Sequence, residues 1–193
     1  MNQEDADLFF LSPRTRISAP NRFSVLYLLR RDIDLCMGVD PDTERDVTLS
    51  YRALWPGAMA MLAGVDLLAK FLAGSDDGRE VGKRFRRFLE CFFDVTKPED
   101  RKAIYQLRNS LLHSFGLYAQ DQKGNVYRFF LTDNGTGPLV SHKPPDQYYV
   151  DLRVLHREFE RAVKLYQDKL NGDGKLQENF TKMFGNYGCV YIG

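Results

Sequence analysis

The strongest structural signal in this chain is a stripe of apolar residues at helical spacing between residues 54 and 72. Because a stripe this wide must be covered by other elements, it predicts the central helix of a bundle. Gly57 and Gly64 on the same segment let a neighbouring element approach closely, and Gly74 is suited to end the helix. The stripe consists of Leu54, Ala58, Met61, Leu62, Val65, Leu68, Ala69 and Leu72.

Four further segments have a helical period. The first follows Asn21, which is suited to cap a helix, and precedes a loop at residues 40–42. The fourth helix has Pro98 in its first turn, with acidic residues that complement the helix dipole. The expected ranges are residues 21–38, 81–92, 96–116 and 152–171.

Between the last two of these helices the period changes to that of strands. Residues 126–132 are rich in β-branched and aromatic side chains, and turn residues flank them on both sides. Residues 139–141 and 148–151 are further strand candidates. The fold class predicted from these patterns is mainly α: a bundle of about five helices with a small antiparallel β-ribbon inserted before the last helix.

The predicted organisation is a single domain with two extensions. Residues 1–20 are expected to form an N-terminal arm, residues 21–172 the helical domain with its β-ribbon at about 117–151, and residues 173–193 a C-terminal tail packed on the domain. At 193 residues and 44% hydrophobic composition, the chain can bury a core without disulfides or metals.

Composition also bounds the location and the partners. The three cysteines are far apart, no spacing typical of metal ligands is present, and the early apolar run is too short for a signal peptide or a membrane span. We therefore expect a cytoplasmic protein without a membrane partner, bound metal or cofactor. Because the net charge is only +1, a nucleic acid would have to be bound by a local patch.

The third helix offers such a patch. Lys83, Arg84, Arg86 and Arg87 place four positive charges in five residues, opposite its apolar side chains. Such a face is either a solvated helix surface or a track for the phosphates of a bound RNA.

The fourth helix carries the candidate chemistry. At about 100° per residue, Ile104, Leu107, Leu111 and Phe115 form its core stripe, while Asn109 and His113 lie nearly opposite and Arg108 lies on the flank. Since positions five apart differ by about 140°, Arg108 and His113 of one chain are expected not to stand side by side. A crossing of two copies at this helix would bring them together and predicts a homodimer.

With Arg108, Asn109 and His113 the segment resembles the HEPN domains, helical bundles whose ribonuclease members carry an arginine, four to six residues and then a histidine, often with asparagine after the arginine. Residues 64–71, Gly-Val-Asp-Leu-Leu-Ala-Lys-Phe, are similar to segments of uncharacterised bacterial proteins of this kind. The resemblance covers roughly residues 20 to 170.

The resemblance implies a metal-independent endoribonuclease, a toxin or defence effector with an antidote protein as a further partner, whose composite site lies in a dimer cleft. Histidine suits proton transfer near neutral pH, and the arginine fork suits phosphate oxygens. The alternative is a non-catalytic HEPN-like dimerisation or binding module. In that case His113 caps helix carbonyls and Arg108 forms a salt bridge with Asp66 or Asp94.

Two further sets of side chains are not expected to have a functional role. Asp66 and Lys70 are four residues apart and are expected to form an ion pair along the second helix. His142 and His156 have no partners at metal-ligand spacing, so no ligand role is expected for them.

Overall fold

The computed structural model describes residues 1–15, 17, 21–39 and 52–191, and the loop expected at residues 40–42 lies outside this part. The described chain forms seven α-helices, one 3₁₀ turn and six strands. The helices are α1 (Gln3–Phe9), α2 (Val25–Met37), α3 (Leu54–Ala73), α4 (Val81–Phe92), α5 (Pro98–Ser114), α6 (Leu152–Gly172) and α7 (Gly174–Tyr187). The strands are β1 (Arg22–Ser24), β2 (Tyr118–Gln120), β3 (Val126–Thr132), β4 (Val140–Lys143), β5 (Gln147–Asp151) and β6 (Cys189–Tyr191).

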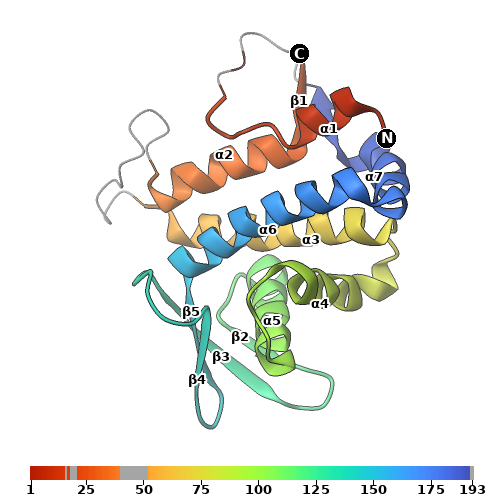
Figure 1. The fold of residues 1–193 in the computed structure, drawn as a ribbon. Coiled ribbons are helices and arrows are strands. Elements are labelled where there is room, and N and C mark those ends of the chain that lie inside the picture. The colour runs from red at the N-terminus through yellow and green to blue at the C-terminus, as the bar shows by residue number, and fades with distance from the viewer. Residues whose placement is uncertain (16, 18–20, 40–51, 192–193) are drawn as a thin grey trace.

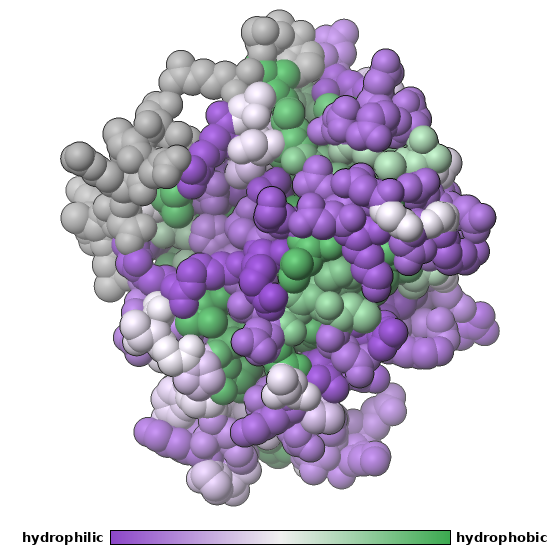
Figure 2. Space-filling view, in the orientation of Figure 1, coloured by the Kyte–Doolittle hydropathy of each residue, from purple (hydrophilic) through white to green (hydrophobic). Residues whose placement is uncertain are grey.

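The central helix predicted from the apolar stripe is α3. It contacts α2, α4, α5, α6 and α7, and Figure 1 shows α2, α3 and α6 running across the molecule above α4 and α5. Among the described helices α3 alone has the length and apolarity of a membrane span, but half of its apolar window is buried inside the fold. Such burial is what the core helix of a soluble protein shows, and hydrophilic side chains cover most of the face in Figure 2.

The prediction of five helices is wrong because both ends of the chain are also helical. Asn2 caps α1 and Asp173 caps α7, each by accepting a hydrogen bond from a backbone N–H. Their aromatic side chains meet on α3: Phe9 lies 4.5 Å from Phe71 and 5.4 Å from Phe180 between ring centroids. The expected arm therefore supplies core residues, and its seven-residue helix is too short to have a clear period.

The chain ends also form a small sheet that the sequence analysis missed. Strands β1 and β6 pair antiparallel, with Phe23 opposite Val190. As a result the first helix does not begin at Asn21; it begins at Val25, where Ser24 Oγ accepts from Tyr27 N at 3.0 Å. The ladder to residues 189–191 determines the conformation of residues 22–24, and nothing nearby in the sequence signals it.

The larger sheet is four-stranded and mixed, so the prediction of an antiparallel ribbon is also wrong. Its strand order is β2-β3-β5-β4, and β3 pairs with β5 in parallel. Strand β4 follows β3 in the chain but lies at the edge, beyond β5. The segments of β3, β4 and β5 were predicted from the sequence and that of β2 was not, whereas this crossover depends on how the hairpin of β4 and β5 docks.

The two faces of this sheet differ. Tyr127, Phe129 and Val150 are buried on the inner face, which packs against the helices. Arg128 and Phe130 alternate with them on β3 and are exposed. The sheet lies at the lower end of the molecule in Figure 1, beside α5, and Phe130 on its outer face is 42% exposed.

Gly64 tests the close packing around α3. A Cβ at this position would lie 2.6 Å from Cζ of Phe159 and 2.8 Å from Cδ2 of Leu29. Alanine gains about 1 kcal/mol in helix propensity, but overpacking a core costs about 1–3 kcal/mol. We expect Gly64→Ala to lower the free energy of unfolding, measured by urea denaturation.

Gly185→Ala is the matched control. Gly185 is exposed within α7, and nothing lies within 4 Å of the Cβ that alanine would add. Here helix propensity alone acts, and we expect stabilisation by about 0.5–1 kcal/mol. Equal effects of the two substitutions would contradict the close packing at Gly64.

Candidate active site

Arg108 and His113 are in direct contact within one chain. Nη1 of Arg108 lies 2.7 Å from Nε2 of His113 and 3.1 Å from Oδ1 of Asn109. The expectation that Arg108 and His113 cannot stand side by side is therefore wrong. A helical wheel places side-chain origins, whereas the long arginine side chain reaches along the helix over the rise of about 7.5 Å that separates the two positions.

The contact identifies the accepting atom of His113. Arginine only donates hydrogen bonds, so Nε2 of His113 is the acceptor in this contact. His113 is exposed at the end of α5. Nε2 is therefore a proton acceptor that becomes free once another group takes the guanidinium.

Asp66 on α3 holds the other side of the guanidinium. Nη2 of Arg108 forms a salt bridge with Oδ2 of Asp66, and the two side chains are only 11% and 14% exposed. Asp66 is therefore paired with Arg108, whereas Lys70, its expected partner, lies over the Tyr187 ring at 4.3 Å. Because a nearly buried charge requires a partner, Asp66 explains why an arginine is tolerated beside the core.

The end of α5 differs from its expected course. Phe115, predicted to lie in the core stripe, follows the helix in the left-handed conformation with φ 48° and is 71% exposed. Ser110 Oγ donates to the carbonyl oxygens of Gly116 and Tyr118 at 2.6 and 2.9 Å. These bonds turn the chain so that β2 runs back beside α5.

A pocket of about 700 Å³ lies over this arrangement. Arg108, Asn109 and His113 line it from α5, and Tyr118 lines it from β2. Asn109 and His113 thus lie on the outer face, as the helical wheel predicted. Tyr118 was missed because its position depends on the turn after α5, and no pattern in the sequence marks it as part of a site.

A larger groove of about 990 Å³ adjoins the pocket. The two share Tyr105, Gln106, Asn109 and Gln120, so they form one continuous depression. Two acidic side chains, Glu90 and Asp121, line the groove against seven basic ones. The basic ones are Arg79, Lys83, Arg86, Arg87, Arg101, Lys102 and Lys123.

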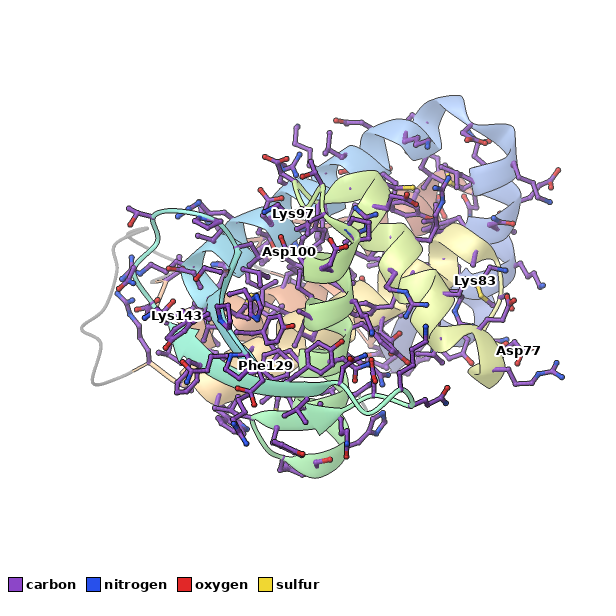
Figure 3. All side chains as sticks on the ribbon, turned by 90° about the horizontal axis from the view of Figure 1, so that it is seen from below. Asp77, Lys83, Lys97, Asp100, Phe129 and Lys143 are labelled. Atoms are coloured by element: carbon purple, nitrogen blue, oxygen red, sulfur yellow. The ribbon has the colours of Figure 1, made fainter. Side chains whose placement is uncertain are left out.

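Three of the four basic residues singled out on the third helix, Lys83, Arg86 and Arg87, line this groove. Arg84 does not: it is 4% exposed, and its Nη1 donates to the carbonyl oxygen of Asp77. Position 84 lies next to Phe85 and one turn before Phe88, both fully buried, so it falls on the inner side of α4. Figure 3 labels Lys83 on α4.

Salt bridges offset part of the groove's charge. Hydrogen bonds from Asn125 and then Lys102 hold the pKa of Asp121 well below its usual range, so this carboxylate stays ionised and neutralises Lys102. Arg86 lies over the Tyr105 ring at 5.4 Å. Neither Arg86 nor Lys123 forms a salt bridge with any residue in the described ranges, so no carboxylate there competes with a bound anion for either of them.

The remaining histidines lie elsewhere. His142 stacks on Tyr148 with ring centroids 4.6 Å apart, and Nε2 of His156 lies 3.0 Å from Oδ1 of Asp34 without hydrogen-bond geometry. Across residues 1–15, 17, 21–39 and 52–191, no group of three or more His, Cys, Asp or Glu side chains is placed to hold a metal ion.

Comparison with known proteins adds no family assignment. No protein-family model matches the chain, and no curated protein or solved structure is significantly similar to it.

Proposed function

We propose that this chain is a HEPN-like, metal-independent endoribonuclease that cleaves RNA in the pocket over Arg108, Asn109 and His113. The observation that carries the proposal is the 2.7 Å contact of Arg108 with Nε2 of His113 in a pocket continuous with a basic groove. A phosphate-binding cation and a proton acceptor meet at one point, beside a surface suited to the RNA backbone.

The reaction follows from the two side chains. An RNA phosphate competes with Nε2 of His113 for Nη1 of Arg108, which frees Nε2. The ribose 2′-hydroxyl then passes its proton to Nε2 while its oxygen bonds to phosphorus, and the bond from phosphorus to the 5′-oxygen breaks. The products are a 2′,3′-cyclic phosphate and a 5′-hydroxyl, and Arg108 stabilises the charge on the phosphorane.

Asp66 and Asn109 act as positioning residues in this scheme. Asp66 keeps one nitrogen of the guanidinium engaged, so that Nη1 points into the pocket when the phosphate arrives. Asn109 accepts a hydrogen bond from the same Nη1 and limits its rotation. A fixed cation stabilises a developing charge better than one that must first be ordered.

The leaving 5′-oxygen needs a proton, and each chain provides one histidine to this pocket. We therefore propose a homodimer in which a second copy of the outer face of α5 brings its own His113, in the protonated form, as the acid that donates a proton to this oxygen. The helix-wheel argument for a dimer no longer applies, because Arg108 and His113 meet within one chain; the requirement for both an acid and a base replaces it. A toxin or defence role in the cytoplasm, controlled by an antidote protein, belongs to the same proposal.

One observation favours the second candidate, a non-catalytic binding module. Asp66, Asn109 and His113 of the same chain already engage the Arg108 guanidinium, as a structural link between α3 and α5 requires. In that reading the basic groove binds an anionic partner without turnover.

Cleavage separates the two candidates. We expect the protein to cut single-stranded RNA with chelator present and to leave 2′,3′-cyclic phosphate ends. His113→Ala removes the proton acceptor and should slow cleavage by about 10²-fold or more. Arg108→Ala should be at least as harmful, and Asp66→Asn should slow cleavage less because the guanidinium remains.

His142→Ala is the control, since His142 lies outside the pocket and its removal should leave cleavage unchanged. Circular dichroism checks that each variant is folded. No cleavage by the wild type, or equal cleavage by wild type and His113→Ala, would leave the binding module as the function.

The dimer is tested by mass and by mixing. Light scattering at micromolar concentration should give twice the 22.3 kDa of one chain. Adding an equal amount of folded His113→Ala protein to the wild type should reduce the activity per wild-type chain to about half, because half of those chains then pair with a chain that lacks the second histidine. Unchanged activity in the mixture, or a monomer that cleaves RNA, would rule out the composite site.

A further inference from the structure

We propose that the outer face of the four-stranded sheet binds the unpaired bases of the RNA, so that the substrate is single-stranded where it crosses β2, β3 and β5. This inference rests on the proposed function, because it names the form of the substrate at the same site. It concerns the outer face of the four-stranded sheet, whereas Arg108 and His113 lie on the neighbouring helix α5.

The face is built by strand alternation and register. Phe130 on β3 lies opposite Tyr149 on β5, and Arg128 on β3 lies opposite Tyr118 on β2. Ser141 of β4 lies opposite Tyr149 on the other side. Since paired positions share a face, the aromatic side chains of three strands lie on one surface.

Two of these side chains form a stacked platform. The rings of Phe130 and Tyr149 are 4.9 Å apart between centroids and nearly parallel at 17°. Phe130 is 42% exposed, whereas Tyr127 and Phe129 on the inner face of the same strand are buried. Unpaired bases stack on exposed aromatic rings, so Phe130 offers the stacking surface and the half-buried Tyr149 packs against it.

The charges on this face favour a polyanion over an apolar partner. Lys143 Nζ lies 4.8 Å above the Tyr149 ring, and Figure 3 shows it across α5 from Lys83. Arg128 pairs with Asp146, but its side chain is 58% exposed and that of Asp146 only 14%, so the cation is the more accessible partner. Lys143 and Arg128 are therefore placed to contact phosphates while the bases stack on the aromatic rings.

Tyr118 joins the platform to the proposed active site. It is 52% exposed, stands on the outer side of β2 and also lines the pocket of His113. Strands are about 4.8 Å apart, so the platform begins within about 10 Å of Tyr118. A strand cleaved at His113 can therefore continue over Tyr118 and onto Phe130 and Tyr149, which only exposed bases can contact.

Binding to a 2′-O-methyl RNA oligonucleotide tests this without cleavage, because the nucleophilic hydroxyl is blocked. By fluorescence anisotropy we expect the full-length protein to bind the single strand more tightly than a blunt duplex of the same sequence. Phe130→Ala and Tyr149→Ala should each weaken single-strand binding by about tenfold, the size of one lost stacking contact. Phe130→Trp should keep the affinity, and Phe130→Leu should lose it.

Tyr191→Ala is the control: Tyr191 is 73% exposed, but on β6 in the other sheet, and its removal should change nothing. Equal binding of single strand and duplex, wild-type affinity of Phe130→Ala and Tyr149→Ala, or retention by Phe130→Leu would each overturn the inference. Failure of cleavage with weakened binding by Phe130→Ala would reject the nuclease proposal and leave the base-binding face standing.

Discussion

Burial of the apolar surface of α3 is the constraint on which the rest of the fold depends. Leu62, Val65 and Leu68 are completely buried, and five other helices pack around the helix that carries them. Within this surface Asp66 is the exception, a carboxylate only 14% exposed. Since an unpaired charge there would be costly, its salt bridge with Arg108 couples the packing of α3 on α5 to the geometry of the pocket.

Sequence periodicity predicted the interior of the fold better than its ends. The helices now seen as α3, α4, α5 and α6 follow from stripes of ten or more residues, a length at which the period is clear. Helix α1 is too short for that, and the strands β1 and β6 depend on pairing across more than 160 residues. The parallel pairing of β3 with β5 is likewise determined by tertiary packing, because the sequence pattern of each strand is compatible with several partners.

In the candidate site, too, the sequence predicted what depends on the local helical period and missed what depends on side-chain reach and on where the helix ends. The wheel correctly placed Asn109 and His113 outward, since that depends only on the helical period. It failed for Arg108 because the reach of the side chain, and not its angle, decides the contact with His113. It failed for Phe115 because the helix ends one residue earlier. The basic face predicted on the third helix was wrong for Arg84, because four charges within five residues do not all fit on one outer face.

The basic groove and the outer face of the sheet differ in chemistry, and under the proposed function they would bind different parts of an RNA although the net charge of the chain is only +1. The groove on α4 and α5 concentrates cations and suits the sugar-phosphate backbone. The sheet face offers stacked rings and suits bases. Strand β2 contributes to both surfaces, because Gln120 lines the groove and Tyr118 lies on the outer face of the sheet. Ser110, which holds the turn into β2, thus links the position of the sheet to α5, and under the proposed function a change in that turn would separate phosphate binding from base binding.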